Sequence, residues 1–185
     1  MKTYLKDQLE RFLESVDAAL GEQVAVIVIG GTAAALRYGV RHPTRDIDTM
    51  TAVSAGLANA VQAAREATGL EVPMRMSGIA EGPEGLESRL ERALPHLERL
   101  IVRVPEKHDL VLMKTSRAEQ HDLDAIAEIH AYSPLNLDIL VQRFKEELDP
   151  VGNPLWIRAN FLAVVERLFP QSVEAVVRRL RTASS

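Results

Sequence analysis

Two aspartates one residue apart, Asp46 and Asp48, follow the glycine pair Gly30-Gly31 within residues 26–50, VIVIGGTAAALRYGVRHPTRDIDTM. Residues i and i+2 of a β-strand point to the same face, so both carboxylates are expected to project together. Two like charges on one face repel each other unless a positive charge lies between them. A hard divalent cation such as Mg²⁺ or Mn²⁺ prefers oxygen ligands of this kind and would supply that charge.

The glycine pair follows an apolar, β-branched run and precedes an alanine-rich segment. Such a strand–glycine–helix pattern presents the N–H groups and the positive dipole end of a helix, and glycine lets a phosphate approach the backbone closely. We therefore predict a phosphate cradle beside the aspartates. The alternatives are a simple tight turn for the glycines, and ion pairs with Arg41 or Arg45 for the aspartates.

The surrounding sequence predicts strands and helices that would hold this motif in place. Apolar and β-branched runs predict strands over residues 24–29, 47–53, 72–76 and 100–104. Apolar spacing and alanine content predict helices over residues 2–20, 32–38 and 55–68, with Gly21 and Gly39 as end signals. Residues 77–85 are rich in glycine and proline and are expected to form a surface loop.

From Pro105 onward the pattern predicts helices alone. Ser133-Pro134 and Asn153-Pro154 each read as a capping residue before a proline at the first helical position. A last helix over residues 172–180 would end in an arginine-rich tip. We expect an α+β fold, a small mixed β-sheet flanked by helices with a C-terminal helical extension, divided into a core over residues 1–132 and an extension over residues 133–185 packed on it.

Composition restricts the classes of protein that fit. The 185 residues carry a net charge of −4, which argues against a protein that coats nucleic acid. There is no cysteine, which excludes disulfides, thiolate metal sites and a cysteine nucleophile. No window approaches the roughly 20 apolar residues of a membrane span, and MKTYLKDQLERF lacks the apolar core of a signal peptide. We expect a cytoplasmic protein without a membrane partner.

The stretch IGGTAAALRYGVRHPTRDIDTM resembles the polymerase-beta-like nucleotidyltransferase superfamily, whose pattern is a glycine turn followed by Asp-apolar-Asp on a strand. The resemblance covers roughly residues 24–132. It is strongest to the bacterial branch related to the abortive-infection type IV toxins, in which an arginine and a threonine precede the aspartates, as Arg41 and Thr44 do here. That branch also carries a downstream lysine, arginine and aspartate, found here as Lys114, Arg117 and Asp122.

The resemblance implies a role for each matching residue. Residues that would hold a nucleoside triphosphate are Gly30, Gly31, Thr32, Arg41, Thr44 and Lys114. Asp46 and Asp48 would bind Mg²⁺ or Mn²⁺, and Asp122 would orient groups or act as a base. A solvated surface lysine is the alternative for Lys114, and a charge on a helix face is the alternative for Asp122.

The implied activity is transfer of a nucleoside monophosphate from a triphosphate to an unknown acceptor, such as tRNA or another RNA, a protein or a small molecule. The implied partner is a cognate antitoxin or toxin protein, or another component of phage defence. The sequence departs from the superfamily pattern at one point. Many members carry a third carboxylate on a later strand, but the predicted strand 100–104 holds Arg103 and no acidic residue. Glu98 and Glu106 only flank that strand. A catalytically inactive relative that binds a nucleotide or a partner protein is therefore the alternative.

The dipeptides His108-Asp109 and His121-Asp122 suggest a second comparison, with HD-type phosphohydrolases. Those enzymes bind metals through such a pair on an all-helical fold. The strand-rich first half of this chain argues against that fold, so we reject this interpretation.

Overall fold

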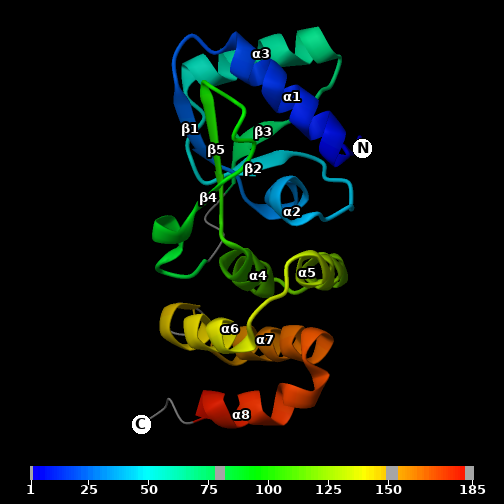
Figure 1. Ribbon diagram of the computed structural model, residues 1–185, viewed down its shortest axis with the longest axis vertical. Helices are drawn as coiled ribbons and strands as arrows, with labels where there is room; N and C mark the ends of the chain where they lie inside the picture. Colours follow the sequence, from blue (N-terminus) through cyan, green and yellow to red (C-terminus); the bar gives the residue numbers. More distant parts are fainter. Residues whose placement is uncertain (1, 78–81, 149–153, 182–185) are drawn as a thin grey trace. The chain divides into compact units, whose positions relative to one another are not determined.

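The computed structural model describes residues 2–77, 82–148 and 154–181, and it has the mixed α+β fold that the sequence predicts (Figure 1). The chain divides into two compact units. The sheet unit comprises Met1–Ile79 and Leu90–Pro105, and the helical unit comprises Ala80–Arg89 and Glu106–Ser185. Nowhere in these described ranges is a helix both long enough and apolar enough to span a membrane.

The sheet unit holds all of the strands that the structure describes. Its elements are α1 (Lys6–Ala19), β1 (Val24–Ile27), α2 (Gly30–Tyr38), β2 (Ile47–Thr49), α3 (Ala55–Thr68), β3 (Met74–Met76), β4 (Glu91–Arg92) and β5 (Leu100–Val104). Strand β5 pairs in parallel with β1 and antiparallel with β4, while β2 and β3 form a separate parallel pair. A β-bridge between Val28 and Thr49 joins the two sheets, as does the hydrogen bond that the Ile29 N–H donates to the Asp48 carbonyl at 2.9 Å.

Helix α1 covers the sheet unit with an apolar stripe and lies beside α3 (Figure 1). Its buried side chains are Leu9, Phe12, Leu13 and Val16, which recur at the three- and four-residue spacing seen in the sequence. The prediction that this helix begins at residue 2 is wrong. Tyr4 instead forms an antiparallel bridge with Thr44, so the chain is extended until α1 begins at Lys6.

The strands that flank the aspartates are shorter than predicted, because threonine hydroxyls replace part of the backbone ladder. The Ile27 N–H donates to Thr51 Oγ1 at 3.0 Å, and Thr49 Oγ1 donates to the Thr51 carbonyl at 2.7 Å. Strand β2 therefore ends at Thr49 and does not continue to residue 53. The predictions for α3 and β5 are confirmed. Helix α2 begins at Gly30, two residues earlier than predicted, and ends at Tyr38 as predicted, with Gly39 as its cap.

The helical unit is built from short helices around an apolar centre. Its elements are η1 (Leu86–Arg89), α4 (Lys107–Thr115), α5 (Gln120–Tyr132), α6 (Leu137–Arg143), the π-helical turn η2 (Phe144–Leu148), α7 (Pro154–Leu168), η3 (Pro170–Ser172) and α8 (Val173–Arg181). Phe144 and Phe161 stack at its centre, with ring centroids 4.1 Å apart. Helices α4 and α5 group with this unit, and a core that ends at residue 132 stays a prediction.

One of the two predicted helix starts is wrong. Ser133 ends α5, and α6 begins only at Leu137, where Asn136 Oδ1 accepts hydrogen bonds from the N–H groups of Asp138 and Ile139. Pro154 is the first residue of α7, as predicted. Its expected cap, Asn153, lies outside the described residues, as do residues 78–81 of the predicted surface loop. The last helix begins one residue later than predicted, after the turn η3.

Candidate functional site

Asp46 and Asp48 direct their carboxylates to one point beside β2, where Arg75 of β3 meets them. The parallel register of β2 and β3 places Arg75 opposite Asp48. Arg75 Nη2 lies 2.5 Å from Asp46 Oδ2, and Arg75 Nε lies 3.5 Å from Asp48 Oδ1. The side chain of Asp46 is 18% exposed and that of Asp48 is 30% exposed, so both carboxylates remain open to solvent. Arg75 thus provides a positive charge that the aspartate pair requires.

The electrostatics of this pair remain unbalanced. Burial and the neighbouring charge of Asp48 raise the pKa of Asp46 above its ordinary value, although Arg75 and Arg45 act in the opposite direction. The negative charge of the pair is therefore only partly offset by the protein. Such a site favours a further cation.

The glycine pair begins α2 directly beside Asp48. Gly30 has a φ of +68°, which few residues other than glycine adopt, and a Cβ built on it would lie 3.8 Å from Asp48 Oδ2. A Cβ on Gly31 would lie only 3.1 Å from Thr44 Oγ1. The first N–H groups of an α-helix have no partner within the helix, and the cap residue Ile29 supplies no side-chain hydrogen bond to those of α2. The turn therefore needs glycine, and it also presents amides and a positive dipole end beside a carboxylate.

The other residues predicted to hold a nucleotide in this unit are Thr32, Thr44 and Arg41. The buried Thr32 donates its hydroxyl to the Asp46 carbonyl at 2.7 Å, and Thr44 donates to the same carbonyl at 3.3 Å. These bonds position the segment that carries Asp46. Arg41 is exposed in the connection between α2 and β2. Nucleotide contacts of these three residues stay predictions.

Lys114 and Asp122 lie in the helical unit, where they bind each other. Lys114 Nζ is 3.2 Å from Asp122 Oδ1, and Arg117 clamps the same carboxylate through Nε to Oδ2 at 2.7 Å and Nη2 to Oδ1 at 2.9 Å. The side chain of Lys114 is 8% exposed and that of Asp122 is fully buried. The alternatives of a solvated lysine and a charge on an exposed helix face are therefore wrong.

The surroundings of Asp122 oppose a role as proton acceptor. Burial alone would raise its pKa, but the hydrogen bonds from Arg117 and the charge of Lys114 outweigh burial and lower it. Burial lowers the pKa of Lys114, and the charge of Asp122 partly restores it. A carboxylate with a lowered pKa and two bonded oxygens is a weak base. The geometry favours a positioning role for Asp122.

No third carboxylate joins Asp46 and Asp48 in the part of the chain that the structure describes, where no group of three or more His, Cys, Asp or Glu side chains could hold a metal ion. Of the two flanking acids, Glu106 is engaged within the helical unit. Its Oε1 lies 2.8 Å from His108 Nδ1, and its Oε2 lies 2.6 Å from Arg143 Nη1.

Both residues of the first histidine–aspartate dipeptide, His108-Asp109, form hydrogen bonds or ion pairs within the helical unit. His108 Nε2 accepts from the Asn136 N–H at 2.9 Å, which makes Nδ1 the protonated nitrogen that donates to Glu106. Asp109 is buried and forms ion pairs with Arg89 and Arg143. These contacts explain the dipeptide without a metal.

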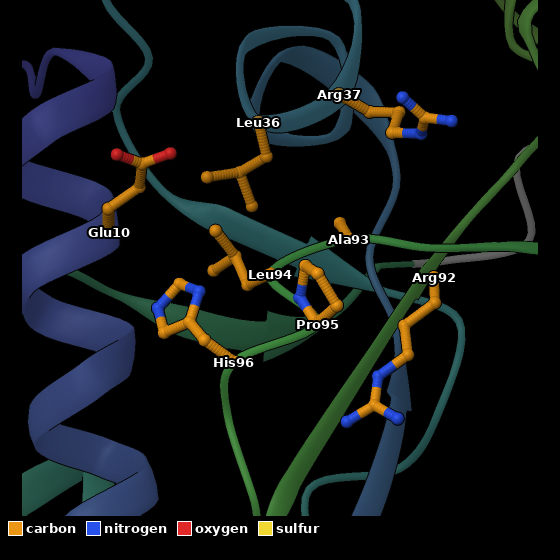
Figure 2. Close-up of a pocket in the computed structure, with 8 residues that line it drawn as sticks. All are labelled: Glu10, Leu36, Arg37, Arg92, Ala93, Leu94, Pro95 and His96. Carbon is orange, nitrogen blue, oxygen red and sulfur yellow. The ribbon is translucent and has the colours of Figure 1, made fainter.

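A separate pocket of about 440 Å³ lies in the sheet unit (Figure 2). Its lining comes from α1, α2 and the segment that runs from β4 toward β5: Glu10, Leu36, Arg37, Arg92, Ala93, Leu94, Pro95 and His96. None of the predicted site residues lines it. Several of its charged groups already have partners, since Arg37 pairs with Glu91 and His96 lies 3.2 Å from Glu14. We assign this pocket no role in the site at β2.

Sequence reasoning missed Arg75. A signal was present, because MRM places one arginine within a predicted strand that follows the aspartate strand after a single helix. Consecutive strands joined by a helix tend to pair in parallel, which brings such a residue beside the aspartates.

The match to a known family includes both aspartates and the glycine pair. Residues 7–157 match the model of a family described as a nucleotidyltransferase of unknown function (DUF6036). The comparisons with curated proteins and with solved structures found no match. The narrower relation to the toxin branch stays a prediction. The match covers most of the 185 residues, and the chain therefore belongs to the DUF6036 family of nucleotidyltransferases of unknown function.

Proposed function

We propose that this protein transfers a nucleoside monophosphate from a nucleoside triphosphate to an acceptor hydroxyl, with Mg²⁺ or Mn²⁺ held at Asp46 and Asp48. The observation that carries the proposal is the position of Asp48 Oδ2 beside Gly30, at the N-terminus of α2. A carboxylate pair for a cation and a helix end for phosphates thereby lie within one site. The family match supports the same class of activity.

The residues of the site fit a hard divalent cation. Two partly exposed carboxylates face one point, and burial together with the charge of Asp48 raises the pKa of Asp46. Water and phosphate oxygens would complete the coordination, as is usual for Mg²⁺. When bound, the cation would neutralise charge on the triphosphate and orient it.

The chain itself contributes position and charge. The N–H groups at the start of α2 would hold phosphate oxygens, and Gly30 leaves room for them because it has no side chain. The acceptor hydroxyl oxygen would form a bond to the α-phosphorus and release its proton to water, while the bond to pyrophosphate breaks and pyrophosphate leaves. Because Asp122 is a weak base here, catalysis would depend on positioning and on electrostatic stabilisation.

The acceptor and the partner follow from the narrower resemblance. We propose an RNA such as tRNA, a protein or a small molecule as the acceptor, and a cognate toxin or antitoxin protein as the partner. Lys114 would act on phosphate charge in this scheme through the N–H donors of its ammonium group that Asp122 does not take up.

One observation favours a second candidate function, that of an inactive relative that binds a nucleotide or a partner. Arg75 already lies between the two carboxylates, so the protein neutralises the pair in part without a metal. The two candidates differ in whether an acceptor becomes labelled.

A labelling experiment decides between them. The protein is incubated with Mg²⁺ or Mn²⁺, each of the four α-³²P-labelled NTPs, total RNA and cell lysate, and calorimetry records nucleotide binding in parallel. We expect label on an acceptor, and loss of both label and metal-dependent binding in Asp46→Asn/Asp48→Asn. The matched control Asp7→Asn/Glu22→Gln removes two exposed carboxylates from the same unit and should behave as wild type. Binding without labelling would support the inactive relative, and unchanged binding and labelling in Asp46→Asn/Asp48→Asn would refute the proposed site.

A further inference from the structure

Arg75 contacts both aspartates and would compete with a cation held by the same pair. A Mg²⁺ ion binds carboxylate oxygens at about 2.0–2.1 Å. Arg75 Nη2 is already 2.5 Å from Asp46 Oδ2, and its Nε reaches Asp48 Oδ1. The guanidinium therefore takes up one oxygen of each carboxylate, Asp46 Oδ2 and Asp48 Oδ1, and its positive charge opposes the binding of a second cation beside it.

The hold of Arg75 on the aspartates is weak enough to exchange. Its side chain is 65% exposed, and ion pairs of exposed side chains contribute little free energy. β3 presents it at the edge of a strand pair in which neighbouring Met76 is also exposed. The guanidinium can leave the carboxylates without breaking a buried contact.

A triphosphate would offer Arg75 a second anionic partner close by. Arginine binds phosphate oxygens through two parallel hydrogen bonds, and these bonds are stronger than those between neutral groups. The helix end that favours phosphates begins at Gly30, next to the carboxylate that Arg75 contacts. Phosphates seated there would lie near the guanidinium.

We propose that Arg75 couples metal binding to nucleotide binding: it holds Asp46 and Asp48 until a triphosphate enters, and then moves to the phosphates and leaves the carboxylates to the divalent cation. This proposal rests on the proposed function, because it assumes that the cation and the triphosphate share this site. It makes Arg75 a positioning residue with a regulatory effect. The metal would then bind together with the nucleotide and poorly without it.

The test measures Mn²⁺ binding by electron paramagnetic resonance, first with Mn²⁺ alone. Wild type is compared with Arg75→Met, and with Arg11→Met as a control that removes an exposed arginine of the same unit from α1. We expect Arg75→Met to bind Mn²⁺ about tenfold more tightly than wild type, within the range of coupling between contacting groups. Arg11→Met should match wild type, and Arg75→Met/Asp46→Asn/Asp48→Asn should lose the site. Equal Mn²⁺ affinity in Arg75→Met and wild type would overturn the proposal.

A second arm adds α,β-methylene triphosphates of the four nucleosides. In wild type the triphosphate should increase Mn²⁺ affinity strongly, whereas in Arg75→Met this increase should shrink because the competitor is gone. Equal increases in both proteins would overturn the coupling and leave the proposed function intact. Absence of Mn²⁺ binding in every protein, with and without a triphosphate, would refute the proposed function itself.

Discussion

The two units each hold aspartate beside arginine, in opposite environments. At β2 the carboxylates and Arg75 are partly or largely exposed, and in the helical unit Asp122 is fully buried between Lys114 and Arg117. An exposed ion pair can exchange partners at small cost, whereas a buried carboxylate that is lost leaves its cation buried and unpaired. Similar charged residues thus stand in two settings: a partly exposed cluster at β2, to which we assign ligand exchange in our proposal, and a buried cluster in the helical unit that supports the fold.

The substitution with the largest expected effect on folding stability is Asp122→Ala, and it tests whether the buried cluster is structural. Loss of the carboxylate leaves the ammonium of Lys114 buried without its partner, so we expect destabilisation by about 3–5 kcal/mol. Urea unfolding at pH 7, followed by circular dichroism, measures it. Asp48→Ala is the matched control, and a loss of similar size there would show that both sites are structural.

Lys114→Ala should have the next largest effect. The side chain is buried, so the substitution opens a cavity and removes one partner of Asp122, while Arg117 remains bonded to that carboxylate. We expect a loss of about 2–3 kcal/mol, in the range for truncated buried side chains. Lys114→Met fills most of the volume and should recover part of the loss. If Lys114→Ala unfolds at the same urea concentration as wild type, the lysine does not support the fold.

Local signals account for what the sequence could predict. Helix α3 begins after Ser54, whose hydroxyl accepts from the Leu57 N–H, and ends at Gly69, so both boundaries are set by adjacent residues. The same-face placement of Asp46 and Asp48 likewise follows from strand geometry over three residues.

Properties that depend on distant pairing could not be predicted in the same way. Arg75 reaches Asp48 only because β3 pairs with β2 in one particular register. Lys114 is buried because α5, α6 and α7 pack against α4, where every residue from His108 to Thr115 is buried. The sequence of α4, KHDLVLMKT, contains four residues with ionisable side chains and gives no local sign that all of them from His108 onward are buried.

A smaller effect, with a defined pH dependence, is expected at Glu106. Burial alone would raise its pKa, but hydrogen bonds from His108 and Arg143 and the charge of Arg143 lower the pKa from its ordinary 4.5 to about 2. A lowered pKa contributes stability that is present above pH 4.5 and is lost as the pH falls toward 2. Glu106→Gln should therefore cost about 1–2 kcal/mol at pH 7 and flatten the acid side of the stability profile. Urea midpoints between pH 2.5 and 7 test this, and a slope equal to that of wild type would contradict it.

The smallest effect, and the one that sharpens the comparison most, is expected for Asp46→Asn. The raised pKa of Asp46, caused by burial and by the charge of Asp48, means that folding disfavours its ionised form. Because its pKa is raised, the contribution of Asp46 to stability is fully present when the pH is below the ordinary pKa, and it is lost as the pH rises through the raised pKa. The ionised carboxylate therefore adds no stability at pH 7. Asp46→Asn should therefore be neutral or stabilising by at most about 0.5 kcal/mol in thermal unfolding at pH 7, as for other partly exposed changes. Millimolar Mn²⁺ should reverse the order, because a cation that binds only the folded protein stabilises wild type alone. If Asp46→Asn instead costs more than about 1 kcal/mol without metal, its pair with Arg75 is structural like that of Asp122, and the contrast between the two units fails.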